Sequence, residues 1–460
     1  MNTSLGESVD AGLKSYERMK DSGVEWLGDV PAHWDVRRLR NVANVLFSNV
    51  DKHSKNDEIA VRLCNYSDVY HNDSIHSGMS FMQATANADE IERFRLHPGD
   101  VLITKDSESW DDIGVPALVQ NTASDIVCGY HLALLRPISG IMNGSFLHRA
   151  LTCPGVAIQF FVRANGVTRF GLSQTAIKSC LLPCPPPSEQ AAFALFLDYA
   201  TDQIKRHIRA KEKLIALLEE QKQAIIHDAV TGRIDVRTGN NYLTYKYSGV
   251  KSIGHIPEHW DVRPAKWHFR EVDERSVTGS EEMLSVSHLT GITPRSQKNV
   301  TMFEAESNIG HKICKPGDIV INTMWAWMGA LGLAKKKGIV SPSYAIYRKT
   351  IDSLLSGDYG EILLRSKPYQ TEYQCLSTGI HTSRLRLYPE TFLRINLICP
   401  SPREQDRIVR FVQHESKNFL RSSELVRKEI TLLKEYRTRL IADVLKGKID
   451  AREAARRLPR

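Results

Sequence analysis

Adjacent carboxylates stand at two places in the sequence. Asp111-Asp112 and Glu281-Glu282 are pairs of the kind that could share a proton or hold a divalent cation. The chain also repeats itself internally, and neither pair has a counterpart at the matching place in the other copy. We therefore interpret both pairs as solvated loop charges.

Thiols are the second group that could do chemistry. The cysteines include no Cys-x-x-Cys pair, and Cys180 and Cys184 lie in an apolar, strand-like run. This spacing favours reduced thiols in a cytoplasmic protein over a structural zinc site. The eight cysteines are Cys64, Cys128, Cys153, Cys180, Cys184, Cys314, Cys375 and Cys399.

The search for catalytic motifs gives a negative result. The sequence has no Gly-x-x-x-x-Gly-Lys-[Ser/Thr] loop, no Gly-x-Gly-x-x-Gly fingerprint, no Gly-x-Ser-x-Gly elbow and no His-Glu-x-x-His. It also lacks the Asn/Asp-Pro-Pro-aromatic motif of an amino-methyltransferase. For His33 and His259 a turn-fixing or packing role is the better interpretation. The sequence therefore predicts a binding protein with no catalytic residue and no metal of its own.

A signature that contains tryptophan occurs twice. Residues 22–36 read SGVEWLGDVPAHWDV, and residues 248–262 read SGVKSIGHIPEHWDV. Two further landmarks come after it in the same order, a Pro-Gly-Asp turn (98–100 and 316–318) and a Glu-Gln pair (189–190 and 404–405). We interpret the chain as two copies of one unit.

The offset between the copies changes only inside the β-rich segments. It is 260 − 34 = 226 at the tryptophan, 317 − 99 = 218 at the turn, 405 − 190 = 215 at the glutamine and 447 − 232 = 215 at the glycine after the helix. Loops absorb insertions, whereas one extra residue in a helix rotates every later residue by about 100°. Each copy therefore pairs a variable head with a helix of fixed length.

The composition is that of a soluble globular protein with two to three domains. The 460 residues are 42% hydrophobic and 25% charged, and no apolar run is long enough to span a membrane. The N-terminal segment has no apolar region of the secretory type. These features predict a cytoplasmic protein, and the net charge of +8 is compatible with a polyanionic partner.

The segments between the landmarks predict mixed α/β heads. Residues 59–63, 100–104 and 131–135 are short β-type runs, and a helix is expected near residues 145–152. We predict an α+β fold in which two globular heads are separated by two long antiparallel coiled-coil helices, with a pseudo-two-fold internal repeat. The predicted segments are 1–21, an N-terminal arm; 22–187, the first head; 188–237, the first long helix; 238–402, the second head; 403–450, the second long helix; and 451–460, a basic C-terminal tail.

The two long helices carry apolar residues at every seventh position. The seam consists of Leu197, Ile204, Leu218, Ile225, Val412, Phe419, Val426, Leu433 and Leu440. Lys211 interrupts it, and its aliphatic stem can lie along the seam. The other faces are polar, which favours exposed coiled-coil rods over two core helices of separate domains. At 1.5 Å per residue, some forty residues make a rod of roughly 60 Å, which would act as a ruler between the heads.

The order of these landmarks resembles one known family. The carrying motifs are Ser-Gly-Val-x-x-[Leu/Ile]-Gly-x-[Val/Ile]-Pro-x-His-Trp at the head of each half, Pro-Gly-Asp before an apolar strand, and Pro-x-x-Glu-Gln opening each long helix. From about Ser22 to Asp450 the chain is similar to the specificity (S) subunit of type I restriction–modification systems.

The resemblance implies a separate function for each part of the chain and for its partner subunits. Each head would be a target recognition domain that reads one half of an asymmetric, bipartite DNA sequence, and the helices would be the conserved spacers between half-sites. Two methyltransferase subunits that carry S-adenosylmethionine would dock on the chain. A motor–nuclease subunit that uses ATP and Mg²⁺ would complete the complex. The subunit itself would be non-catalytic and would bind none of these cofactors.

Two places in each head are the candidate DNA contacts. One comes directly after the strand that begins at the Pro-Gly-Asp turn, and the other is the loop before the last strand of the head. Their exit residues differ between the copies, as two heads with different targets require. In the first head the candidates are Thr104, Lys105, Ser107, Arg163, Asn165 and Arg169; in the second head they are Asn322, Thr323, Trp325 and Arg384.

Two other functions stay open from the sequence. One is an assembly scaffold whose heads bind protein, and the other is a nuclease or methyltransferase with an unrecognised site. The segment before Ser22 is expected to be a loose or partner-contacting arm, and residues 452–460 a frayed terminus close to the first head.

Overall fold

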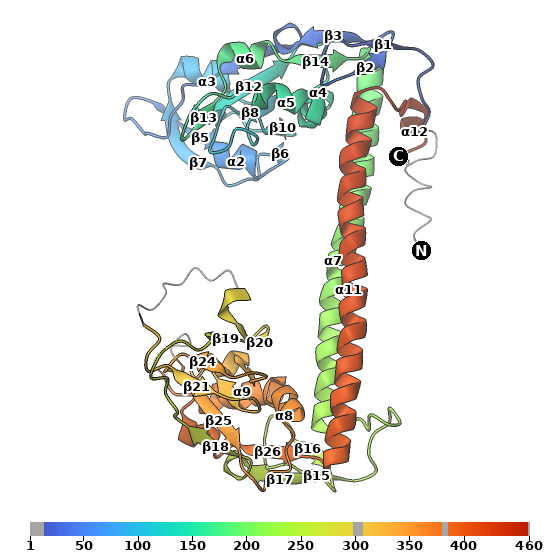
Figure 1. Cartoon of the computed structure of the whole chain (residues 1–460). Helices are drawn as coiled ribbons and strands as arrows, with labels where there is room; N and C mark the ends of the chain where they lie inside the picture. The colour runs from blue at the N-terminus through green and yellow to red at the C-terminus, as the bar shows by residue number, and fades with distance from the viewer. Residues whose placement is uncertain (1–12, 298–306, 380–384, 459–460) are drawn as a thin grey trace. The chain divides into compact units, whose positions relative to one another are not determined.

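The computed structural model describes residues 13–297, 307–379 and 385–458. The chain divides into two compact units, and each contains one head and a part of both long helices (Figure 1). Unit 1 comprises residues 1–211 and 428–460, and unit 2 comprises residues 212–427.

The head of unit 1 is built on a five-stranded sheet in the order β4-β12-β8-β10-β6, beside a three-stranded sheet β11-β5-β7. Strand β12 pairs antiparallel with both β4 and β8. The strands are β1 (Met19–Asp21), β2 (Asp29–Pro31), β3 (Asp35–Arg38), β4 (Ala43–Phe47), β5 (Ile59–Cys64), β6 (Ser74–Ile75), β7 (Met82–Ala86), β8 (Val101–Thr104), β9 (Asp106–Ser107), β10 (Pro116–Val119), β11 (Ile126–Cys128), β12 (Leu132–Pro137), β13 (Phe170–Gly171) and β14 (Leu181–Cys184). The helices are α2 (Tyr66–Tyr70), α3 (Ala88–Phe94), α4 (Gly144–Thr152), α5 (Pro154–Phe161) and α6 (Gln174–Lys178).

The head of unit 2 has a four-stranded sheet in the order β18-β25-β22-β23 and two further strand pairs, β19-β20 and β21-β24. The strands of the unit are β15 (Tyr245–Tyr247), β16 (His255–Pro257), β17 (Asp261–Pro264), β18 (Phe269–Val272), β19 (Leu284–Ser287), β20 (Gly291–Pro294), β21 (Lys312–Cys314), β22 (Ile319–Ile321), β23 (Leu331–Leu333), β24 (Gly338–Val340), β25 (Ala345–Lys349) and β26 (Asn396–Cys399). The helices are α8 (Gly357–Leu364), α9 (Lys367–Leu376) and α10 (Pro389–Phe392). The mixed α/β class expected for both heads is confirmed.

The strand after the Pro-Gly-Asp turn lies inside each sheet and is buried on both faces. Successive side chains of a strand point to opposite faces. Val101 and Ile103 accordingly belong to one apolar cluster of the head, and Leu102 belongs to another. In unit 2, Val320 on β22 is likewise separated from its two neighbours. Continuous apolar runs at these places are therefore required by burial.

The aspartate of the Pro-Gly-Asp turn has the same role in both copies. The carboxylate of Asp100 accepts hydrogen bonds from the His97 amide at 2.8 Å and from Arg136 Nε at 3.0 Å. Asp318 accepts from the Lys315 amide and from Arg348 Nε, each at 2.8 Å. The motif thus fixes the entry to the central strand.

The predicted long helices are α7 (Pro187–Thr231) and α11 (Pro402–Leu445), with 45 and 44 residues. In unit 1 they run antiparallel, because Lys211 of α7 pairs with Glu429 of α11 while the start of α7 packs on the end of α11. The ammonium of Lys211 thus leaves the seam for an ion pair, as expected.

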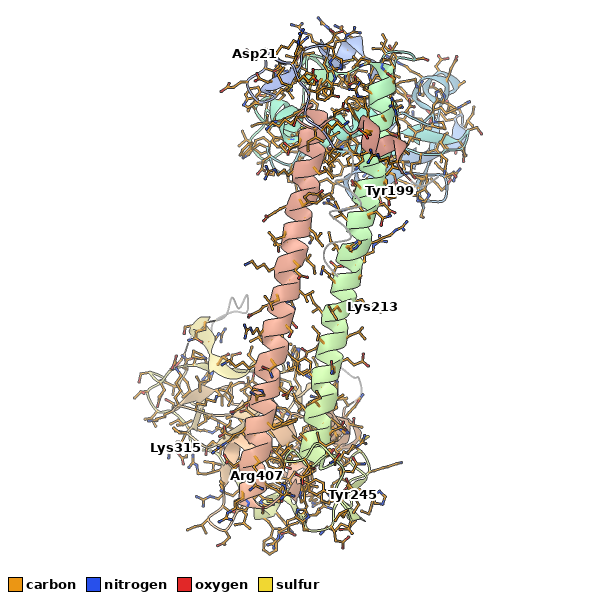
Figure 2. The ribbon with its side chains drawn as sticks, turned by 90° about the vertical axis from the view of Figure 1, so that its right-hand side faces the viewer. Asp21, Tyr199, Lys213, Tyr245, Lys315 and Arg407 are labelled. Atoms are coloured by element: carbon orange, nitrogen blue, oxygen red, sulfur yellow. The ribbon has the colours of Figure 1, made fainter. Side chains whose placement is uncertain are left out.

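The nine residues of the predicted seam are buried or half-buried. Leu197, Ile204, Leu433 and Leu440 belong to unit 1, and Leu218, Ile225, Val412, Phe419 and Val426 belong to unit 2. This burial is what a seam between two helices requires. Lys213, labelled in Figure 2, projects from the exposed polar face of α7.

A buried glutamate joins each head to the start of its long helix. In unit 1 the Glu189 carboxylate accepts hydrogen bonds from the Trp34 indole at 2.9 Å and from the Tyr16 hydroxyl at 3.0 Å. It also lies 2.8 Å from His33 Nε2 and 3.1 Å from Arg452. The tryptophan of the signature is fully buried.

Unit 2 repeats this junction. Glu404 accepts from the Tyr242 hydroxyl at 3.1 Å and from the Trp260 indole at 3.2 Å, and it lies 3.0 Å from His259 Nε2. Burial alone would raise the pKa of Glu404, but hydrogen bonds led by the one with His259 hold it below its usual value. Arg237 bonds to Asp235 instead of reaching this glutamate. Both signature tryptophans are thus buried at the start of a long helix.

The glutamine that comes after the glutamate binds the head from the other side. The side chain of Gln190 accepts from the Asn143 amide at 2.8 Å and donates to the Ile141 carbonyl at 2.9 Å. Gln405 accepts from the Ser356 amide at 2.7 Å and donates to the Leu354 carbonyl at 3.1 Å. The Glu-Gln pair therefore binds the start of each long helix to its head through two separate sets of hydrogen bonds. We call the contacts of Gln190 and Gln405 the glutamine clamp.

Glycines end both long helices in the left-handed conformation. Gly232 has φ 73° and Gly447 has φ 68°. A Cβ atom would lie 2.4 Å from Pro257 at the first and 2.1 Å from Pro31 at the second. Both the conformation and the close approach of the signature proline require glycine.

One of the two alternatives for the N-terminal arm and the expectation for the C-terminal tail are wrong. Residues 13–21 are not loose, since Tyr16 bonds to Glu189 and the Lys14 amide donates to the Asp450 carbonyl at 3.2 Å, while contact of the arm with a partner stays a prediction. The C-terminal segment is not frayed, because it forms α12 (Arg452–Arg456) and Arg452 reaches Glu189. Its expected place beside the first head is confirmed.

Among the described residues, the search for a helix with both the length and the apolarity of a membrane span finds none.

Candidate nucleic-acid interface

In unit 1 the two predicted contact segments are adjacent in space. Strand β9, which comes after the central strand β8, pairs antiparallel with β13, which comes after the predicted loop. Phe170 lies opposite Ser107, and the Leu172 amide donates to the Lys105 carbonyl at 2.8 Å. A short two-stranded ribbon thus joins residues 104–107 with residues 163–171.

The candidate side chains of unit 1 fall into two groups. Thr104 and Ser107 are buried, and Thr104 Oγ1 accepts from the Val115 amide at 3.0 Å. Arg163 is half-buried and donates to Ser179 Oγ at 2.8 Å, so it supports the loop from within. Lys105 is half-exposed, and Asn165 and Arg169 are exposed. Only this second group can meet a partner without rearrangement of the head.

Aromatic residues that sequence reasoning missed surround this ribbon. Burial raises the pKa of Tyr66, while a hydrogen bond with Ser107 and the charge of Arg169 oppose the rise. Tyr66 stacks on Tyr70 with ring centroids 5.3 Å apart, and Trp110 is 52% exposed. The spacing of the two tyrosines on one face of a helical turn was the available signal.

Carboxylates also lie on the loop after β9. Asp106 pairs with His131 at 2.7 Å, Asp112 accepts from the Tyr70 hydroxyl, and Asp111 accepts from Ser109. The side chains of Asp111 and Asp112 therefore both have hydrogen-bond partners in unit 1, whereas we had expected solvated loop charges.

In unit 2 the segment after β22 meets the chain that precedes α10. The Leu387 amide donates to the Thr323 carbonyl at 2.9 Å. Asn322 and Thr323 are buried; Asn322 Oδ1 accepts from the Met324 amide at 3.2 Å, and Thr323 Oγ1 donates to the Ser343 carbonyl at 2.9 Å. Trp325 is 47% exposed. Arg384 lies outside the described residues.

Sequence reasoning missed Arg386, which lies beside the predicted segment. Its Nε donates to Thr323 Oγ1 at 3.2 Å, and its guanidinium lies 5.7 Å from the centre of the Tyr388 ring. The two terminal nitrogens make no hydrogen bond with the described residues. Arg386 is thus held in place by Thr323 and Tyr388, and its two terminal nitrogens are available as hydrogen-bond donors.

The cysteines form no disulfide bond in this structure. All eight cysteines are free, and burial raises the pKa of Cys180 to about 12 and of Cys399 to about 11. Within the described ranges, no three His, Cys, Asp or Glu side chains converge as a metal site would need.

Curated proteins align with parts of the chain, although no model of a protein family matches it. A putative type I restriction enzyme MjaX specificity subunit from Methanocaldococcus jannaschii is 22% identical over 51% of this chain and 52% of that protein. The type I restriction enzyme EcoBI specificity subunit from Escherichia coli is 30% identical over 26% of this chain and 24% of that protein. The chain thus spans about half the length, or less, of these relatives.

Solved structures match over most of the chain. One, described as the structural basis of complex assembly and conformational transition of the type I R-M system, has a TM-score of 0.67 at 15% identity and covers 91% of this chain and 99% of that one. The HsdS subunit from Thermoanaerobacter tengcongensis has a TM-score of 0.55 at 15% identity and covers 91% of this chain and 98% of that one. At these identities the match concerns the fold. The resemblance to type I specificity subunits predicted from the sequence is confirmed.

Proposed function

We propose that the chain is the DNA-specificity subunit of a type I restriction–modification complex, and that its two heads read the two halves of an asymmetric duplex target. In this proposal the fixed lengths of α7 and α11 set the gap between the half-sites.

One observation carries the proposal. The two copies share the glutamate junction, the glutamine clamp and the aspartate turn, yet the residues directly after β8 and β22 differ completely. Lys105 and Asp106 occupy the exit in unit 1, whereas Thr323 and Met324 occupy it in unit 2. A common scaffold with divergent exits is what two readers of different base sequences need.

We assign the direct contacts to exposed or half-exposed side chains beside these exits. In unit 1 they are Lys105, Asn165 and Arg169, and in unit 2 they are Trp325 and Arg386. Arginine and lysine suit phosphate or guanine, and asparagine suits adenine. Thr104, Ser107, Arg163, Asn322 and Thr323 then act as positioning residues, because their polar atoms are engaged inside the heads.

The long helices also expose apolar side chains. Six leucines on α7 and α11 are exposed, and in this proposal they take part in docking of other subunits. They are Leu195, Leu214, Leu217, Leu420, Leu425 and Leu432. We propose that two methyltransferase subunits dock on the helices. Those subunits would supply S-adenosylmethionine, and a motor–nuclease subunit would supply the ATP- and Mg²⁺-dependent step, so that this chain needs no catalytic residue.

The test is sequence-selective binding by the assembled complex. Methylated positions in the host genome would give both half-sites and their spacing. Duplexes carrying that target, a target with one half-site scrambled and a target with one extra base pair in the gap are then compared at one salt concentration. We expect tight binding only to the first. Equal affinity for all three would instead support an assembly scaffold without base readout. Methyl transfer by the purified chain alone would support a self-contained enzyme.

A further inference from the structure

A polar cavity lies where the head of unit 1 meets α7 and α11. Its volume is about 210 Å³, and its lining includes Arg149 from α4, Thr201 and Lys205 from α7, and Arg437 and Thr438 from α11. A second cavity of about 250 Å³ adjoins it and shares Asp73, Arg149, Thr201 and Lys205. Two further carboxylates line the second cavity, Asp198 and Asp202, and Asp202 pairs with Arg206 at 2.7 Å. We call the two cavities together the junction pocket.

Three cations from three helices converge on this pocket. Two of them have carboxylate partners: Lys205 pairs with Asp73 at 2.8 Å, and Arg149 pairs with Asp198 at 2.8 Å. The hydrogen bond from Lys205 holds the pKa of Asp73 below its usual value, so this carboxylate is charged and compensates Lys205.

The third cation is uncompensated. Arg437 is half-buried and forms no ion pair with the described residues. The hydroxyl groups of Thr152 and Thr438 in the same lining donate to the Arg149 and Lys434 carbonyls, so the hydroxyl of Thr201 is the threonine donor left for a ligand. An unpaired, partly desolvated guanidinium beside further donors is the arrangement that favours an anion.

His148 supplies an independent sign of a ligand. It lines the second cavity, is buried, and its Nε2 has no hydrogen-bond partner. Burial lowers the pKa of His148 to about 4, and its other ring nitrogen bonds to the Pro116 carbonyl. Because that nitrogen must donate to the carbonyl, Nε2 is unprotonated and can accept a proton donor.

In unit 2, uncharged residues stand at the places that match Lys205, Asp198 and Arg149. The helix offset of 215 relates Lys205 to Leu420 (420 − 205) and Asp198 to Gln413 (413 − 198). The helix caps Asn143 and Ser356, which both bond to the clamp glutamine, give an offset of 213 and relate Arg149 to Ile362 (362 − 149). Lys205 and Arg149 are therefore not part of the shared scaffold, whereas Arg437 matches another cation, Lys222 (437 − 222 = 215).

We propose that the junction pocket binds a phosphate group. Arg437, Arg149 and Lys205 contact its charged oxygens, the Thr201 hydroxyl donates to it, and Nε2 of His148 accepts from a protonated phosphate oxygen. Inorganic phosphate keeps such a proton in a large fraction of its molecules near neutral pH, and phosphate monoesters, with a second pKa of about 6, in a smaller fraction, whereas the phosphodiester of a DNA backbone carries none. The pocket therefore favours free phosphate or a monoester over a backbone phosphate. This inference does not depend on the proposed DNA function.

The test uses the full chain without DNA or partner subunits. Inorganic phosphate is titrated at constant ionic strength, and binding is followed by calorimetry and by the rise in melting temperature. We expect one saturable site per chain. Arg437→Gln weakens it by about tenfold, as expected for losing one hydrogen-bonded charge. The matched control is Arg439→Gln on the same helix, because the Arg439 side chain is 85% exposed and pairs with Asp443; it leaves the affinity unchanged.

Dimethyl phosphate identifies the source of the ligand. Weaker binding of this diester supports the assigned role of His148, and equal binding overturns that role and assigns the pocket to a DNA backbone phosphate. A linear, unsaturable response, or equal affinity in Arg437→Gln with an unchanged melting temperature in the absence of phosphate, overturns the pocket itself.

Discussion

The candidate contact surfaces of the two heads stand on the same scaffold and differ in charge. In unit 1 the loop after β9 carries Asp106, Glu108, Asp111 and Asp112. In unit 2 the segment from Asn322 to Gly329 has no charged residue, and the neighbouring charge is the cation Arg386. The shared junction residues therefore do not constrain the residues after the central strand, and in the proposed function this lets the two heads differ in specificity.

The junctions themselves differ in one contact. Glu189 is bonded to Arg452 as well as to its tyrosine, histidine and tryptophan, whereas Glu404 has the latter three and, in place of an arginine, the Ser401 hydroxyl at 3.3 Å. We expect Glu189→Ala and Glu404→Ala each to lower the free energy of unfolding by about 3–5 kcal/mol, since each leaves buried donors without an acceptor. The loss at Glu189 is expected to be the larger by about 1 kcal/mol. Urea unfolding of both variants measures this, and a smaller loss at Glu189 would contradict the ranking.

Buried titratable groups at matching places have opposite pH dependence. His148 corresponds to Glu361 (361 − 148 = 213). The pKa of His148 falls from 6.5 to about 4 on folding, so its stabilising contribution is present above pH 6.5 and is lost as the pH falls towards 4. The loss is about 3 kcal/mol. Burial raises the pKa of Glu361, so its cost is present at high pH and disappears on acidification.

Amide hydrogen exchange resolved by unit checks this difference. Unit 1 is expected to lose protection between pH 6.5 and 4, and His148→Gln to flatten that loss. Glu361→Gln is expected to remove the opposite slope from unit 2. The same slope in both units would show that these two groups do not control the acid response.

Arginines beside the two exits differ in how firmly they are held. Arg386 is fixed by Thr323 and Tyr388, whereas the exposed Arg169 has no hydrogen bond to the described residues. We expect Arg386→Ala to weaken specific DNA binding by the assembled complex about 10- to 100-fold and to relax selectivity at one base pair. Arg169→Ala is expected to weaken binding less and without change in selectivity. Lysine at each position is the control, since it keeps the charge but loses the bidentate geometry.

The ion pairs that join the head of unit 1 to α7 are expected to have the smallest effect. Lys205→Leu installs the residue that unit 2 has at the matching place, Leu420. Because this ion pair with Asp73 is exposed, we expect a change of less than about 1 kcal/mol in the free energy of unfolding, and less still at high salt. Thermal unfolding at two salt concentrations measures it, and a larger loss would mean that the pair fixes the head.

Much of the fold could be predicted from the sequence because the repeat marks the features that burial and helix geometry fix. The central strand, the long helices and the buried tryptophans all stand at landmarks shared by both copies. The hydrogen-bond partners of Glu189 and Glu404 could not be predicted from the repeat. The signature repeats at an offset of 226 and the helix at an offset of 215, so spacing does not show that the two segments meet. The roles of Tyr16 and Arg452 were also missed, although the sequence held a signal: Tyr242 and Arg237 are their equivalents at offsets of 226 and 215.

The candidate site was predicted less well than the fold. The adjacency of the two contact segments depends on a short strand pair, and strand partners are not encoded in spacing. Arg386 escaped notice because the matching residue of unit 1 is Gly171 (386 − 171 = 215), so a comparison of the copies drew attention to Arg169 and Arg384 instead.

Unit 2 is one continuous stretch of chain, whereas unit 1 is completed by Leu440, Val444 and Leu445 at the end of α11 and by Arg452. During synthesis the first head therefore emerges before the residues of α11 that complete its core have been made. At 5–20 residues per second, the missing part of its core arrives on the order of tens of seconds later. Unit 2 is complete once residue 427 is made, 13 residues (440 − 427) before Leu440, so its chain is complete slightly before that of unit 1. The later-made head is thus expected to be the first to reach its native state.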